Sequence, residues 1–149
     1  MKLLRTDSKN SDFIRLVVDL DKHLAIKNCE SDFFFRQFNK IDQIKNVVVA
    51  YIDNEAVGIG AFKYFSPKTI EIKRMYVSPL KRGTGLATKI LKELEAWALE
   101  LDNENAVLET GTNMDDAISL YLKNNYELTD NYGQYIGVIN SICFKKSLK

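Results

Sequence analysis

The segment from residue 69 to residue 101 constrains the fold more than any other part of the chain. The run Thr69–Val77 is β-branched and aromatic, which predicts a strand, and Ser78-Pro79 ends it. From about Gly85 to Leu101, apolar residues recur every three or four positions, which predicts a long amphipathic helix. Because such a helix must bury its apolar face, this segment predicts a strand, a basic glycine-containing loop and a helix that packs on a sheet.

Strands and helices alternate along the rest of the chain. Further strands are predicted at 3–5, 46–52, 57–64, 106–108, 126–128 and 136–144. Further helices are predicted at about 13–24, after a cap at Ser31-Asp32, and from a cap at Thr112 or Asn113 to Asn124-Asn125. The order β-α-α-β-β-β-α-β-α-β-β predicts a mixed α+β class, with a central, largely antiparallel sheet flanked by about four helices.

Composition restricts the classes of function. The 149 residues predict a single domain, 1–149, and 46% hydrophobic and 28% charged residues are typical of a globular protein. A net charge of +1 argues against nucleic acid as a partner, and no apolar run is long enough to span a membrane. Early charges exclude a signal peptide, so we expect a cytoplasmic protein. Cys29 and Cys143 lack metal-ligand spacing, so we expect no metal and two small apolar residues.

The loop Arg82-Gly83-Thr84-Gly85-Leu86-Ala87 carries the chemical signal. Glycines let a backbone turn tightly and approach a ligand, and the N–H groups at the start of the following helix favour an anion. Lys81 and Arg82 add positive charge at long range. A pyrophosphate would suit this loop, and the alternative is an ordinary strand-to-helix turn with solvated basic residues.

Two other nucleotide motifs do not fit the loop. A P-loop requires a glycine directly before a lysine, and no glycine precedes Lys89. A dinucleotide fingerprint requires a third small residue where Thr88 stands, although Glu109 could supply the ribose-binding acid. Five residues separate the strand from Gly83, whereas the glycines of that fold follow their strand at once. Binding of NAD or ATP is therefore the weakest reading of the loop.

The loop and its surroundings resemble a known family. Residues 82–87 fit the Q/R-x-x-G-x-G/A signature of the GNAT superfamily of N-acetyltransferases. The resemblance extends to residues 71–79, 108–111 and 117–126, and the tail at 132–135 and 141–144 resembles a small bacterial single-domain type. Asn125 departs from the usual glycine, but asparagine tolerates the same left-handed conformation.

The resemblance implies acetyl-CoA as co-substrate, bound between the fourth and fifth strands of a GNAT-like sheet. Its pantetheine arm would pair with Met75, Tyr76 and Val77, and Asn113 would bond the same region. Its pyrophosphate would rest on the N–H groups of a run of loop and helix residues: Arg82, Gly83, Thr84, Gly85, Leu86, Ala87 and Thr88.

The resemblance also implies the catalytic residues. Tyr121 occupies the general-acid position, because a tyrosine hydroxyl can give a proton to the departing thiolate. Its alternative role is a packed aromatic. Glu71 would be the base that takes the amine proton, unless it is an exposed strand residue paired with Lys73 on the same face. Glu109 competes with Glu71 for that role.

We therefore expect an N-acetyltransferase that moves an acetyl group to a primary amine of a small molecule or peptide. The alternative is a non-catalytic acetyl-CoA sensor or partner module, and a homodimer is one option for its assembly. Tyr132 and Tyr135 are candidates to line the acceptor pocket, and Lys73 and Arg74 would favour a carboxylate there unless both are solvated. We expect the single histidine, His23, to be structural or at the surface, and Phe33-Phe34-Phe35 to form core or pocket wall.

Overall fold

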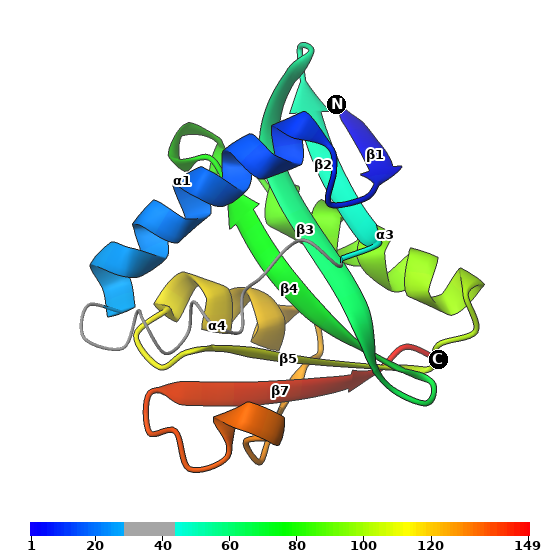
Figure 1. Cartoon of the computed structure of the whole chain (residues 1–149), viewed down its shortest axis with the longest axis vertical. Coiled ribbons are helices and arrows are strands. Elements are labelled where there is room, and N and C mark those ends of the chain that lie inside the picture. The colour runs from blue at the N-terminus through cyan, green and yellow to red at the C-terminus, as the bar shows by residue number, and fades with distance from the viewer. Residues whose placement is uncertain (29–43) are drawn as a thin grey trace.

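A computed structural model describes residues 1–28 and 44–149, and a seven-stranded sheet forms its centre (Figure 1). Every neighbouring pair of strands is antiparallel except β4 and β5, which run parallel. The spatial order is β1-β2-β3-β4-β5-β7-β6. The strands are β1 (Lys2–Thr6), β2 (Asn46–Ile52), β3 (Glu55–Ser66), β4 (Thr69–Val77), β5 (Asn105–Gly111), β6 (Glu127–Thr129) and β7 (Ser141–Ser147).

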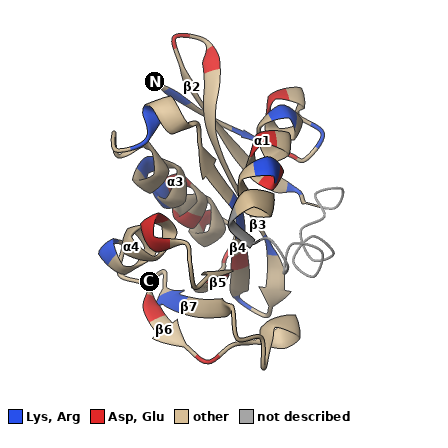
Figure 2. Cartoon of the chain, turned by 90° about the vertical axis from the view of Figure 1, so that its left-hand side faces the viewer, with Lys and Arg blue, Asp and Glu red and all other residues tan. Residues whose placement is uncertain are grey.

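Helices cover both faces of the sheet. Figure 2 shows α1 (Ser11–Asn28) and α3 (Leu86–Glu100) on opposite sides of the strands. Phe13, Leu16 and Val17 of α1 pack against one face, and Ile90, Leu91 and Leu94 of α3 pack against the other. The shorter α4 (Asp115–Lys123) follows β5 and adds Tyr121 to the α3 core. The helices α1 and α3 therefore bury apolar residues that their sequence periods predicted.

The mixed α+β class and the largely antiparallel sheet are confirmed. The ranges predicted for β2 and β4 match those observed, and α1 and α3 lie where their periodicity placed them. The predicted second helix, the phenylalanine run at 33–35 and Cys29 lie outside the described residues. Within residues 1–28 and 44–149, no helix is both long and apolar enough to cross a membrane.

Two local predictions were wrong. The N-cap of α4 is Met114 rather than Thr112 or Asn113, because the Met114 amide donates to Gly111 O in a turn that holds both polar residues outside the helix. Residues 136–140 form a loop, so the last strand covers 141–147. The cause is Asn131, whose Nδ2 donates to three carbonyl oxygens of this region and holds them away from strand pairing: Tyr135 O, Val138 O and Ser141 O, at 3.1, 3.2 and 3.1 Å.

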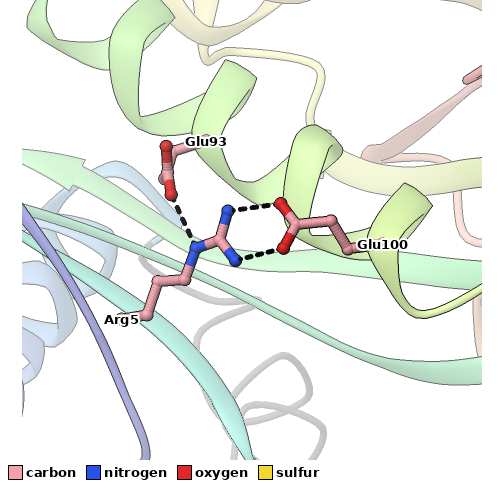
Figure 3. A network of polar contacts seen from close by, with 3 residues as sticks. All are labelled: Arg5, Glu93 and Glu100. Atoms are coloured by element: carbon pink, nitrogen blue, oxygen red, sulfur yellow. Dashed lines mark hydrogen bonds and ion pairs between the residues drawn. The ribbon is translucent and has the colours of Figure 1, made fainter.

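A charged network fastens the edge strand β1 to α3 (Figure 3). Arg5 donates from Nε to Glu93 at 2.6 Å and from both terminal nitrogens to Glu100 at 2.8 and 2.7 Å. Its guanidinium also lies over the Trp97 ring at 5.2 Å. The hydrogen bonds to Glu100 and Glu93 raise the pKa of Arg5 above its usual value, so the charge is permanent.

Two glycines of β3 let α3 approach the sheet closely. A Cβ atom on Gly60 would stand 2.6 Å from Met75 Sδ and 2.8 Å from both Ile90 Cγ2 and Leu94 Cδ1. A Cβ on Gly58 would meet Ile90 Cδ1 at 2.8 Å, with its next neighbours at 3.4 Å. The position of α3 therefore depends on the absence of side chains here.

We expect Gly60→Ala to lower the free energy of unfolding by about 1–3 kcal/mol, because the added methyl overpacks the contact between β3 and α3. For a chain of this length that corresponds to roughly 2–4 °C in Tm for each kcal/mol. Thermal unfolding measures the effect. Gly58→Ala is the graded control and should lower Tm less, since it meets a single close atom. An unchanged Tm for Gly60→Ala would contradict this account of the packing.

Candidate active site

The two parallel strands separate part of the way along their length. Pairing between β4 and β5 is confined to three positions and ends at Glu71 and Val107. Beyond this point β4 continues for six residues to Val77, and β5 continues for four to Gly111. The gap opens in the middle of the sheet, where backbone and side chains of both strands can contact a ligand.

A bulge in β4 sets which way its side chains point. Arg74 has φ +60°, a conformation that costs a non-glycine residue about 1–2 kcal/mol. The pairing with β3 shifts at the same place, between Ile59 and Ala61. Lys73 reaches Tyr135 and Arg74 reaches Asp21 of α1, so two successive side chains lie on the same side of the sheet. Met75 instead contacts the α3 side, where its Sδ lies beside Gly60.

A cavity of about 670 Å³ lies between the end of β4, the start of α3 and the length of α4. Ten of the eleven residues predicted to bind the cofactor line it. Thr84 does not, and its Oγ1 instead donates to Lys81 O at 2.7 Å within the loop. The ten are Met75, Tyr76, Val77, Arg82, Gly83, Gly85, Leu86, Ala87, Thr88 and Asn113.

The N-terminus of α3 faces this cavity and is suited to an anion. Gly83 and Gly85 have φ of +77° and +81°, values that L-residues with a side chain rarely adopt. Gly85 is the N-cap and supplies no side-chain capping bond, and Lys89 N donates to Gly85 O. The preceding N–H groups, Leu86 to Thr88, therefore lack intrahelical acceptors and carry the positive end of the helix dipole.

Arg82 is exposed, but its side chain bonds to the end of β4. Its Nε donates to Val77 O at 2.8 Å, and its guanidinium lies 5.4 Å from the Tyr76 ring centre. Besides the positive charge that the sequence analysis noted, this arginine fixes the loop to the last residue of the strand. Arg82, which the sequence analysis assigned to cofactor binding, therefore also helps to hold the loop in its conformation.

A smaller cavity of about 110 Å³ adjoins the first. It holds most of the charged groups of this region, among them Glu71, Lys73 and Glu109. Tyr121 lines both cavities, and four apolar residues do so too: Leu20, Met75, Met114 and Ala117. Tyr121 therefore stands where the two cavities meet.

Tyr121 is held rigidly by aromatic neighbours. Its ring lies 5.8 Å from that of Tyr126 and 6.0 Å from that of Phe144, and the residue is 5% exposed. Burial, with a smaller contribution from the negative charge of Glu109, raises the pKa of its hydroxyl well above the usual value near 10. The hydroxyl keeps its proton at neutral pH, so it can donate a hydrogen bond or a proton.

Glu71 is buried rather than exposed, with 2% of its surface accessible. The Tyr132 hydroxyl donates to its Oε2 at 2.6 Å, and Lys63 Nζ lies 4.0 Å from its Oε1. The alternative of a solvated strand residue is therefore wrong, and Tyr132 contacts the site by holding this carboxylate.

Glu109 differs from Glu71 in its surroundings. Ser141 Oγ donates to its Oε2 at 2.7 Å, and burial raises the pKa of this carboxyl to about 7. The Ser141 hydrogen bond and the charge of Lys73 act in the opposite direction but do not cancel the effect of burial. Glu109 can therefore gain and lose a proton near neutral pH.

Several lining residues were not predicted from the sequence. Leu20 and His23 of α1 face the larger cavity, and Ser141 of β7 orients Glu109. His23 was expected to be structural, and nothing in the order of the residues around it indicates that α1 crosses the opening. Contacts between distant elements produce these positions, so no local pattern could have found them.

The comparisons with known proteins agree with this geometry. The Acetyltransferase (GNAT) family model matches residues 14–126. An uncharacterized N-acetyltransferase of Archaeoglobus fulgidus is 30% identical over 122 residues, which cover 74% of this chain and 82% of the relative. A structure assigned as an acyl-CoA N-acyltransferase, from Klebsiella pneumoniae, has a TM-score of 0.84 at 27% identity, covering 99% of this chain and 97% of that one.

A more distant structure shares the fold alone. It is a GNAT family acetyltransferase from Elizabethkingia anophelis with acetyl-CoA bound, with a TM-score of 0.60 at 20% identity, covering 68% of this chain and 75% of that one. The splayed parallel strands, the glycine loop at the start of α3 and the match over most of the chain lead to one conclusion: this chain belongs to the acetyltransferase (GNAT) family, and it is an acyltransferase.

Proposed function

We propose that this protein transfers the acetyl group of acetyl-CoA to a primary amine of a small molecule or peptide, with Tyr121 as general acid. The observation that supports this most is the position of Tyr121 at the junction of two adjoining cavities. The larger cavity would take the cofactor and the smaller one the acceptor. A hydroxyl between them is well placed to donate a proton to the sulfur as the carbon–sulfur bond of the thioester breaks.

The larger cavity suits acetyl-CoA in shape and charge. Its glycine loop and the start of α3 would hold the pyrophosphate through backbone N–H groups. Along the gap, β4 has no β5 partner from residue 72 onward, so its backbone groups there can pair with the amides of a pantetheine arm. When bound, the cofactor supplies an activated acyl thioester; orientation and proton transfer come from the protein.

The buried hydroxyl of Tyr121 would give its proton to the departing thiolate. Its raised pKa keeps the hydroxyl protonated at neutral pH, so it is available to donate to the sulfur as negative charge develops there. The aromatic packing against Tyr126 and Phe144 would hold the hydroxyl in one position during turnover.

We assign the base role to Glu109 ahead of Glu71. Both carboxylates line the acceptor cavity, but Glu71 already accepts a short hydrogen bond from Tyr132 and has Lys63 beside its other oxygen. Glu109 has a pKa of about 7, which is suited to taking a proton from an amine at neutral pH. The sequence prediction that names Glu71 remains open to the pH test below.

We expect Gly85→Val to weaken acetyl-CoA binding by at least tenfold. Valine is strained at φ +81° by about 1–2 kcal/mol, and relief of that strain moves the N–H groups that face the pyrophosphate. Isothermal titration measures the affinity. The matched control is Gly137→Val, which carries the same strain at φ +78° outside the cavity and should leave the affinity unchanged. Equal affinities in wild type and Gly85→Val would remove the pyrophosphate assignment.

We expect Tyr121→Phe to lower kcat by roughly 10²–10⁴-fold, the usual weight of a general acid, with little change in acetyl-CoA affinity. Release of free CoA thiol measures turnover. Tyr126→Phe is the control, because it also removes a buried hydroxyl, one bound to Glu95 at 2.9 Å and outside both cavities. Wild-type turnover in Tyr121→Phe would exclude the acid role. Intact cofactor binding with no transfer to any amine would favour a non-catalytic acetyl-CoA sensor.

We expect the pH profile of kcat/KM to separate Glu109 from Glu71. Both the base and the acceptor amine must lose a proton, so log kcat/KM should bend from a slope of about two to a slope of about one near pH 7. The bend should disappear in Glu109→Gln and persist in Glu71→Gln, because the pKa of about 7 belongs to Glu109. Loss of the bend in Glu71→Gln alone would return the base role to Glu71.

A further inference from the structure

The acceptor cavity contains a buried cation that lacks an ion-pair partner in the described part of the chain. Lys73 is 8% exposed, and its one hydrogen bond to a described residue runs from Nζ to the neutral Tyr135 hydroxyl at a long 3.3 Å. No described carboxylate oxygen lies within 4.0 Å of Nζ. Burial lowers the pKa of this lysine, which reflects the cost of keeping an ammonium in this position.

The charged groups around Lys73 are already engaged. Arg74 forms an ion pair with Asp21 of α1 at 2.7 Å. The carboxylates of Glu71 and Glu109 accept hydrogen bonds from Tyr132 and Ser141. Glu71 and Glu109 favour the charged form of Lys73 only from a distance. Within the site, Lys73 is therefore the charged group best able to gain from an incoming partner of opposite charge.

Lys73 and Glu109 present opposite charges to the same small cavity. Both line it together with Tyr121, and each influences the pKa of the other. Glu109 is bonded by Ser141 through Oε2, and its Oε1 forms no hydrogen bond with the described residues. A ligand with a negative group at one end and an amine at the other would match this pair of charges.

We propose that the acceptor is a small amino acid, whose carboxylate binds Lys73 Nζ while its amine faces Glu109; this inference rests on the proposed function. One ammonium suits a single carboxylate better than a phosphate, because the neighbouring cation, Arg74, already pairs with Asp21. The apolar lining supplied by Leu24, Met114 and Ala117 favours a short carbon chain between or beside the two groups.

The proton balance follows from this placement. The neutral amine nitrogen forms a bond to the acetyl carbonyl carbon, and the carbon–sulfur bond breaks. Glu109 takes the proton that the nitrogen loses, and Tyr121 gives a proton to the sulfur. Solvent then returns a proton to Tyr121 and removes one from Glu109, so the net products are an N-acetyl amino acid and CoA.

Matched acceptors test the carboxylate. Glycine, β-alanine and L-alanine are each compared with their own primary amides at one pH. We expect kcat/KM for each acid to exceed that of its amide by roughly 10- to 100-fold, the range of one hydrogen bond between charged groups. The comparison is conservative, because a carboxylate raises the pKa of the adjacent amine and leaves less of it neutral.

Lys73→Met tests the residue, since methionine has a similar length and no charge. We expect the acid-to-amide ratio to fall to near one in this variant. Lys63→Met is the matched control: it removes a lysine from β3 that lies 4.0 Å from Glu71 but outside the cavity, and it should keep the wild-type ratio. Lys73→Arg keeps the charge and should retain part of the preference.

A binding measurement provides a readout independent of turnover. In the presence of CoA, N-acetylglycine should raise the Tm of wild type and Lys63→Met, but its amide should not, and neither compound should do so in Lys73→Met. Equal use of acids and amides by wild type, or an unchanged ratio in Lys73→Met, would overturn the amino-acid assignment and leave the acetyltransferase proposal standing. Failure to acetylate any amine would overturn that proposal, and the thermal shifts would still decide whether Lys73 binds a carboxylate.

Discussion

The separation of β4 from β5 is the constraint on which the rest of this molecule depends. A parallel pair that hydrogen-bonded along its full length would close the sheet, and the backbone of β4 would then have no free groups for a ligand. The left-handed Arg74 lies in the part of β4 that has no β5 partner, where the pairing with β3 also shifts. Its ion pair with Asp21 offsets part of the strain and ties the bulge to α1. The strained residue, the gap between β4 and β5 and the ion pair with α1 therefore all occur in the same stretch of β4.

Charge burial follows from that opening. The gap brings Glu71, Lys73 and Glu109 away from bulk water but against a cavity, so each needs a partner within the protein or from a ligand. Hydroxyl groups of Tyr132, Tyr135 and Ser141 supply these partners at 2.6, 3.3 and 2.7 Å. Burial raises the pKa of Glu109 to about 7 and lowers that of Lys73, and the neighbouring groups only partly oppose these shifts. The site is therefore polar and reactive within an otherwise apolar fold.

The sequence predicted the parts of the fold that local pattern determines. The β-branched runs of β2 and β4 and the 3.6-residue period of α3 gave correct ranges, since burial of one face leaves a periodic trace. The loop at 136–140 was missed because three side-chain hydrogen bonds from the nearby Asn131 decide its shape, and the apolar residues of the segment carry no sign of them. The sequence also did not reveal that Lys73 and Glu71 are buried, because charged residues on a strand usually face water. For the candidate site, the sequence singled out the glycine loop and Tyr121, which line the larger cavity, while the charges of the smaller cavity depend on pairings across the sheet.

The clamp between Arg5 and α3 has a consequence for the order of assembly. Its two ion pairs join residues 88 and 95 positions apart, so the first strand of the chain is fixed by one of the last turns of a helix made much later. During synthesis β1 emerges first, yet neither β2 nor the acidic partners on α3 exist at that time. The edge of the sheet that starts the sequence therefore completes late, and contacts of such long range slow the search for the native state. The edge strand can pair with β2 once residue 52 has been made, but its attachment to α3 forms only after residue 100 has been made.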